Sequence, residues 1–386
     1  MRNKGQIIMK KTLLALAVSG AAVAAPGLVH ALEAKISGQI NRAIIAHDNG
    51  EQDAINHVDN SISGSRIRFI GSEKYRSRNG GVLEYGAKLE LQQQSNASSK
   101  MQAGQYDDVS DSQSVNIRHQ VVYVKGAAGK LSIGQTDGAA NGTAETDLSG
   151  TSVVSYSDAG SDLLSGINYA NTNGTINNNT VGGLTGQFDG LGRHDVIRYD
   201  APAFGPVNLA VSMGNGGSTE VAARYAAEVG EGHKLAAAIG WADAGDYRNN
   251  PNGTAATNTD DAKDGLYGTT DDIEQDVSIT ALSVSFLAAG GFNATLSYST
   301  ESNDATDPTY TYAKVGYKHG QHAVSLDYGV RDNDTSADNK PTSTSVGYVY
   351  KPASPVDLYA SYRVESADLD NVEDVSALIL GGRVKF

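Results

Sequence analysis

The 386-residue chain is acidic and contains no cysteine, and these two properties exclude several classes of protein. It has 44 Asp and Glu residues against 30 Lys and Arg, which gives a formal charge of −14 at pH 7. This balance argues against nucleic-acid binding, which needs a basic surface. The lack of cysteine rules out disulfides, thiol catalysis and cysteine metal sites.

The first 31 residues have the pattern of a secretory signal peptide. Lys10 and Lys11 precede an apolar run over 13–25, and a small-x-small cleavage site ends at Ala31. The run is too short to span a membrane as a helix. We therefore expect residues 1–31 to be cleaved and 32–386 to form one domain. The leader holds four cations and no acid, so its removal takes the formal charge from −14 to −18.

The rest of the chain is divided into segments of alternating polarity, which predict β-strands. In the segment 356–366, for example, Val356, Leu358 and Val364 share one face, and polar residues such as Asp357 and Arg363 share the other. The predicted strands are 35–48, 61–74, 81–95, 114–126, 129–136, 193–202, 205–215, 218–229, 233–242, 274–287, 291–301, 309–318, 321–331, 342–352, 356–366 and 375–386. Strands that cross a membrane need only about 10 residues of this pattern.

The connections between these strands alternate between short turns and mostly longer polar loops. The long connections are 49–60, 96–113, 137–192, 243–273, 302–308, 332–341 and 367–374, and only the Gly-Gly pair at 216–217 breaks the rule. This alternation places all turns at one rim and all loops at the other, as in outer-membrane barrels. The sequence therefore predicts an all-β, transmembrane antiparallel barrel of 16 strands.

The last strand supports the same prediction. Apolar or small residues occupy every second position from Leu378 to Phe386, and Arg383 and Lys385 occupy the alternate face. A strand of this kind fits a wall between lipid and water.

The segment 136–192 is the longest connection, and we expect it to fold into the lumen. It contains six acids and no Lys or Arg, and its apolar residues are too numerous for a free loop. These apolar residues are Val153, Val154, Tyr156, Leu163, Leu164, Ile167 and Tyr169. A barrel of this size otherwise leaves an open aqueous channel.

We predict that acids on this loop face cations on the wall and that the two sets form the pore constriction. The acids assigned to it are Asp137, Glu145, Asp147, Asp158 and Asp162, and the loop also carries Asp189. The basic wall is assigned to Arg66, Arg68, Lys88 and Arg198, with Arg224, Arg331, Arg363 and Arg383 on the same parity. Charged rings of this kind set ion preference in narrow channels. The alternative is that some of these acids are solvated loop charges.

The sequence predicts no catalytic residues, no metal site and no cofactor. No HExxH, nucleophile-elbow, phosphate-loop or dinucleotide motif is present. His319 and His322 flank a turn instead of sharing a helical face, so they do not indicate zinc. The loop 243–273 contains seven acids, which either bind Ca²⁺ or bridge lipopolysaccharide, or are simply hydrated.

Four stretches carry a resemblance to a known family. Residues 65–73 resemble the motif S-R-x-x-F-x-G-x-E, the run 118–134 resembles R-x-x-x-V-x-L-x-G-x-x-G-x-x-x-L-G, and 193–204 resembles R-x-N-S-V-x-Y-x-S-P-x-F. Residues 357–360 and Phe386 resemble the end of the same sequences. The family is that of the Gram-negative general porins, of the neisserial and β-proteobacterial type with γ-proteobacterial relatives. The resemblance implies a homotrimer of sixteen-stranded barrels with an inward third loop, and Phe386 as the C-terminal signal for the barrel-assembly machinery.

The chain departs from the family pattern at Gln135, where the family usually has an arginine of the basic constriction. Together with the cation-free loop, this departure predicts a weak cation preference. The strand parity of Arg118 is ambiguous. Arg42 shares parity with Ile40 and Ile44, which indicates either a β-bulge or a subunit interface.

The predicted function is a passive, water-filled outer-membrane channel for small hydrophilic solutes and ions. Its predicted surroundings are outer-membrane lipid and lipopolysaccharide. The alternatives are a solute-specific channel, a non-conducting outer-membrane adhesin or structural barrel, and a soluble acidic β-protein.

Overall fold

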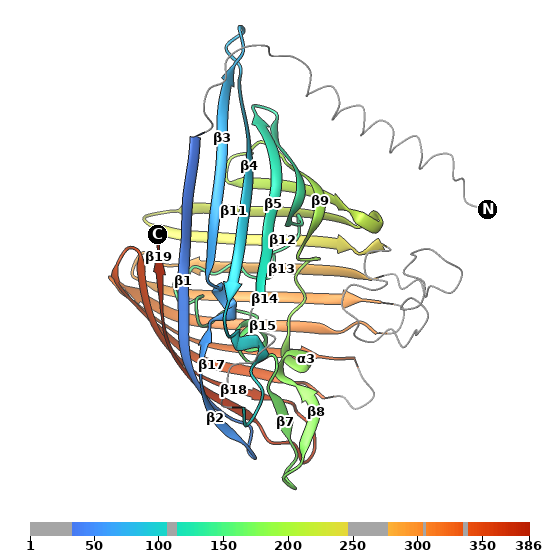
Figure 1. Cartoon of the computed structure of the whole chain (residues 1–386), viewed down its shortest axis with the longest axis vertical. Coiled ribbons are helices and arrows are strands. Elements are labelled where there is room, and N and C mark those ends of the chain that lie inside the picture. The colour runs from blue at the N-terminus through green and yellow to red at the C-terminus, as the bar shows by residue number, and fades with distance from the viewer. Residues whose placement is uncertain (1–32, 106–113, 246–276, 304–305, 335–338) are drawn as a thin grey trace, which may run out of the picture. The chain divides into compact units, whose positions relative to one another are not determined.

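Residues 33–386 form a closed antiparallel β-barrel in the computed structural model (Figure 1). The structure describes residues 33–105, 114–245, 277–303, 306–334 and 339–386. The predicted signal peptide lies outside these residues and stays a prediction. Within the described part of the chain, no helix has the length and apolar character needed to cross a membrane.

Every strand predicted from alternating polarity is present. The wall strands are β1 (Glu33–Asp48), β3 (Arg66–Arg76), β4 (Val82–Gln94), β5 (Ser114–Gly126), β6 (Gly129–Asp137), β9 (Arg193–Asp200), β10 (Val207–Gly214), β11 (Thr219–Val229), β12 (His233–Asp243), β13 (Ser278–Leu287), β14 (Phe292–Ser302), β15 (Thr309–His319), β16 (His322–Asp332), β17 (Thr342–Ala353), β18 (Val356–Ser366) and β19 (Val375–Lys385). β1 pairs with β19 from Gln39↔Lys385 to Asp48↔Ser376, which closes the ring. The prediction of a 16-stranded barrel is confirmed.

One further strand, β2 (Asp53–Asp59), lies where the sequence predicted a loop. β2 pairs with the second half of β1, and β3 pairs with the first half. β2 and β3 therefore share one position in the wall, interrupted by the short helix η1 (Ser61–Ser63). Ala54, Asn56 and Val58 of β2 face inward, and Asp53, Ile55 and His57 face outward. Both faces therefore mix polar and apolar residues, which is why the pattern was missed.

The outer face of the barrel is apolar over β10–β19. Exposed side chains there include Leu296, Leu326 and Val346, and the alternate positions of the same strands are buried serines such as Ser297, Ser325 and Ser345. Because lipid offers no hydrogen bonds, a spanning sheet must satisfy its backbone internally, and a closed ladder does so.

The C-terminal residue completes the closure. The Gly38 amide donates to the Phe386 carbonyl at 2.8 Å, and the Phe386 amide donates to the Gly38 carbonyl at 3.0 Å. The Phe386 ring lies over Gly38, where an added Cβ would come within 2.7 Å of a ring carbon. Position 38 therefore needs glycine if the terminal aromatic is to pack on β1.

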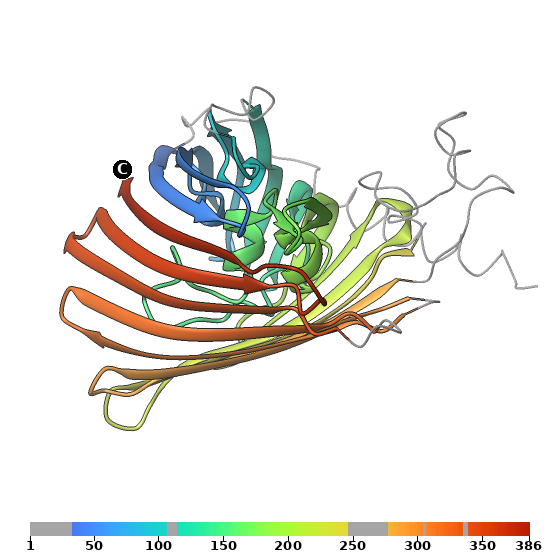
Figure 2. The same ribbon diagram turned by 90° about the horizontal axis from the view of Figure 1, so that it is seen from below.

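The segment between β6 and β9 folds inside the barrel, as the sequence predicted. It contains α2 (Ala159–Leu164), β7 (Asn168–Ala170), β8 (Ile176–Thr180) and α3 (Val181–Thr185). In Figure 2 this green part of the chain lies within the curve of the wall strands. Leu163, Leu164 and Ile167 are fully buried in a cluster with wall residues that include Ile45 and Ile379.

We expect Leu164→Ala to loosen the docked loop, because removing a buried leucine from a packed core costs about 2–5 kcal/mol. Single-channel recordings in planar bilayers should then show a larger and noisier conductance. Ile176→Ala is the matched control, since Ile176 is in the same loop but exposed. A Leu164→Ala channel with wild-type conductance and noise would show that this cluster does not hold the loop.

Candidate functional site

The loop faces β5, β9 and β19 across a cavity of about 440 Å³, which has loop acids on one side and wall arginines on the other. The loop contributes Asn141, Glu145, Tyr156, Asp158 and Asp162, and the wall contributes Arg118, Arg193 and Arg383. We call this cavity the constriction.

Hydrogen bonds to the loop backbone fix the acidic side. Asp189 accepts from the Gly142 amide at 2.5 Å and from the Ala144 amide at 2.8 Å, which holds the turn that presents Glu145. Asp158 accepts from the Gln187 amide at 3.0 Å. The Tyr156 hydroxyl donates to the Asp162 carboxylate.

Carboxylates on the wall position each arginine of the basic side. Arg193 pairs with Asp137 at 2.8 Å, and Arg383 pairs with Asp357 at 2.6 Å. Arg118 is the extra residue of a β-bulge, because β4 and β5 shift register between Glu90 and Leu91. The bulge turns Arg118 into the lumen, which resolves the parity that the sequence left ambiguous.

Glu90 is the centre of the basic wall. Its carboxylate lies 2.5 Å from Arg68, 3.0 Å from Arg118, 3.3 Å from Arg66 and 3.7 Å from Lys88, and its side chain is fully buried. One carboxylate therefore forms ion pairs with four cations, so this part of the wall carries a net positive charge. Sequence reasoning missed Glu90, although its alternation with Leu89 and Leu91 placed it on the lumen face.

The structure brings together only some of the predicted acids. Glu145, Asp158 and Asp162 share the constriction, and Asp137 lies at the end of β6 beside Arg193. Asp147 does not face the pore: its carboxylate pairs at 2.9 Å with buried Lys314 and is itself 6% exposed. The loop backbone carries Asp147 toward β15, a direction that composition does not reveal.

The predicted cations also divide into groups. Arg66, Arg68 and Lys88 gather at Glu90, whereas Arg198 pairs with Asp200 at 2.8 Å in a second cavity that Lys88 also lines. Arg224 donates to the Ala139 and Asn141 carbonyls, and Arg331 donates to the Gly186 carbonyl. These last two hold the loop in place. Arg363 is buried against Glu365.

Two further sequence inferences change with the structure. Gln135 pairs in register with Gln120 and Asp195 and lies with them in an outer-face groove, so it does not bear on the pore charge. Most of the acidic loop 243–273 lies outside the described residues. Among the residues that the structure does describe, no group of three or more potential ligands is arranged to hold a metal ion.

Comparison with known proteins identifies the family. The model of the Gram-negative porin family matches residues 12–369. The chain belongs to that family. Its members are non-enzymatic diffusion channels of the outer membrane, and this porin is one of them. No curated protein matches the chain.

Solved porin structures share the fold at low sequence identity. An anion-selective porin from Comamonas acidovorans is 16% identical, with 92% of this chain and 99% of that chain covered and a TM-score of 0.58. The trimer form of OmpT from Vibrio cholerae is 16% identical, with 92% and 100% covered and a TM-score of 0.56.

The enclosed constriction makes the loop acids of this porin weaker than ordinary carboxylic acids. Removal from bulk water, followed by the negative charges of Asp189 and Asp162, raises the pKa of Glu145 to about 8, although its side chain still reaches lumen water. Burial raises the pKa of Asp162 to about 6. Burial and the Asp162 charge also raise the pKa of Asp158.

We therefore expect ion preference to change with pH. A raised pKa means that each acid loses its charge as the pH falls through that value, so Glu145 loses its charge near pH 8 and Asp162 loses its charge near pH 6. Reversal potentials in a KCl gradient should show that the cation-to-anion permeability ratio falls as the pH is lowered from about 8 to about 6. A change confined to below about pH 5, where ordinary carboxylates titrate, would contradict this expectation.

Proposed function

We propose that this porin admits small hydrophilic solutes and ions by passive diffusion through a water-filled lumen. We further propose that a weak cation preference is present only while the loop acids are charged. The observation that carries the proposal is that Glu145, Asp158 and Asp162 face Arg118, Arg193 and Arg383 across one cavity. In this proposal, the cation preference predicted from the sequence holds only at alkaline pH.

The opposed charges create an electric field across the direction of flow. Charges in water are screened within about 8 Å at physiological ionic strength, so they act on a solute only in a narrow passage. A polar solute that aligns its dipole with this field passes more easily than an apolar one of the same size. The field therefore sorts solutes by polarity without a dedicated binding site.

Neutralising the acidic side tests this proposal. The triple variant Glu145→Gln, Asp158→Asn and Asp162→Asn should lower the cation-to-anion permeability ratio at pH 9, measured as a reversal potential. Asp147 is left intact because its partner Lys314 would otherwise be buried with an unpaired charge.

The matched control is Glu231→Gln, which removes one exposed acid from the short turn 230–232 between β11 and β12. The control should keep the wild-type ratio. An unchanged ratio in the triple variant would mean that the loop acids do not set selectivity. A flux that saturates for one sugar or acid, while other solutes of the same size are excluded, would instead favour a solute-specific channel.

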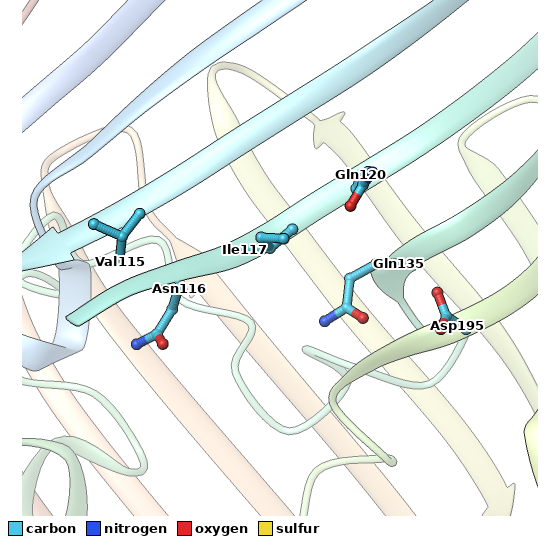
Figure 3. A pocket seen from close by; sticks show the side chains of 6 residues that line it. All are labelled: Val115, Asn116, Ile117, Gln120, Gln135 and Asp195. Carbon is cyan, nitrogen blue, oxygen red and sulfur yellow. The ribbon is translucent and has the colours of Figure 1, made fainter.

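We also propose that this porin is a homotrimer and that the outer face of β1–β6 and β9 meets the other subunits. Gln120, Gln135 and Asp195 lie side by side on three neighbouring strands of that face (Figure 3). Arg42 is also on the outer face, where its guanidinium pairs with Asp59 at 2.6 Å. β1 pairs with β19 and β2 around Arg42 without a register shift, so Arg42 does not mark a β-bulge in β1. A charged residue facing lipid at the bilayer midplane costs about 2–4 kcal/mol, so we expect protein to cover these groups. The related OmpT structure is of a trimer form.

The lack of native cysteine allows a direct test of this face. A fluorophore attached to Gln135→Cys should be protected from quenching by brominated lipid, whereas one on Val324→Cys should be quenched, because Val324 lies on the apolar outer face of β16. Equal quenching at both positions would show that lipid, and not another subunit, covers Gln135.

Contact with lipopolysaccharide and recognition of Phe386 by the barrel-assembly machinery remain predictions. Phe386 is 63% exposed as a residue, which supports its availability for recognition.

A further inference from the structure

A second cavity, of about 450 Å³, lies in the lumen against β4, β5, β6 and β9. The strand register places its charged residues in rows. Glu84, Lys125, Lys130 and Asp200 form one row across the four strands, near the short turns that follow Gly126 and Asp200. We call this cavity the turn-side pocket, because it lies nearer those turns than the constriction does.

Tyr123, Val121 and Ser132 line the turn-side pocket between its charged residues. The register places Gly86 and Ser132 on either side of Tyr123, and Gly134 next to Val121 in the following row. Ser132 is 3% exposed and lines the pocket, and its hydroxyl has no hydrogen-bond partner among the described residues. A buried hydroxyl without a partner is costly unless an acceptor can approach it.

The pocket is lined by one more cation than carboxylate: Lys88, Lys125, Lys130 and Arg198 against Glu84, Asp137 and Asp200. Lys125 and Lys130 stand directly opposite each other, an arrangement that destabilises a sheet when the charges are alike. Within the described part of the chain neither lysine forms an ion pair, and Lys130 Nζ lies 4.8 Å from the centroid of the Tyr123 ring. Lys88 shares Glu90 with three arginines.

The acids at the same rim already have partners. Asp200 holds Arg198 at 2.8 Å, Glu84 accepts from the Tyr123 hydroxyl at 3.1 Å, and Asp137 pairs with Arg193. An anion with several acceptor oxygens would neutralise the excess positive charge and accept a hydrogen bond from the Ser132 hydroxyl.

We propose that the turn-side pocket is a subsite for small dianions, such as inorganic phosphate or a short dicarboxylate. This inference rests on the proposed diffusion channel and adds a class of solute that pauses in it. Lys88, Lys125 and Lys130 neutralise the two charges of the solute, and Ser132 donates to one of its oxygens. The acids beside these cations keep the binding weak, which transport requires because a tightly held solute would block the pore.

The test is a planar-bilayer measurement of chloride current in about 0.1 M KCl at pH 8, with inorganic phosphate or succinate added on the turn side. Either dianion should reduce the current of the wild-type porin with a saturating dependence on concentration. In Lys88→Gln/Lys130→Gln the half-saturating concentration should rise about two- to thirtyfold, the loss expected for two partly exposed ion contacts. Ser132→Ala should raise it by a smaller factor.

Lys351→Gln is the matched control, because Lys351 is also near a turn but lies in β17 beside Asp357, away from the pocket. It should leave the half-saturating concentration unchanged. Each variant must show wild-type conductance steps in KCl alone, which checks folding in the same recording. If the double variant fails this check, the single variants Lys88→Gln and Lys130→Gln replace it.

Two results would overturn the subsite. One is a wild-type current that falls only in proportion to added dianion, without saturation. The other is an unchanged half-saturating concentration in the lysine variants. In both cases the open channel remains, so the proposed function survives. A wild-type protein that forms no conducting steps would instead refute the diffusion channel itself.

Discussion

The chemistry of the lumen depends on burial of the apolar side of the inward loop. A barrel of sixteen strands leaves an aqueous channel unless something fills it, and here the filling is a cluster that includes Val154, Leu163, Leu164 and Ile167. Wall serines complete the docking: Ser283 donates to the Thr143 carbonyl at 2.6 Å and Ser297 donates to the Ala144 carbonyl at 2.8 Å. Because the loop is fixed on that side, its acids are held against the water column.

The two sides of the constriction respond differently to conditions. The arginines are positioned by carboxylates of the wall, whereas the raised pKa values of Glu145 and Asp162 let these two acids gain and lose protons at ordinary pH. The wall near Glu90 also carries more positive than negative charge, although the chain as a whole is acidic. Net charge is therefore a poor guide to what the pore prefers, and the local arrangement of charges decides it.

The fold could be read from the sequence because lipid on one side and water on the other impose an alternation with a period of two. That signal fails where the surroundings differ, as at β2, whose inner face meets the loop in place of water. The apolar residues of the loop predicted its docking, but not which acids would face the pore. Asp147 turns to Lys314, Arg118 enters the lumen through a bulge, and Gln135 points outward, and each of these depends on geometry beyond strand parity.

The most direct test of the docked loop is a disulfide between the loop and the wall. Thr151 Oγ1 lies 2.8 Å from Ser325 Oγ, and the chain has no other cysteine to compete. In the variant Thr151→Cys/Ser325→Cys we expect a disulfide to form on oxidation, with conductance close to that of the wild type. Two thiols that stay free and reactive after oxidation would show that the loop does not lie against β16, and the proposed constriction would then be wrong.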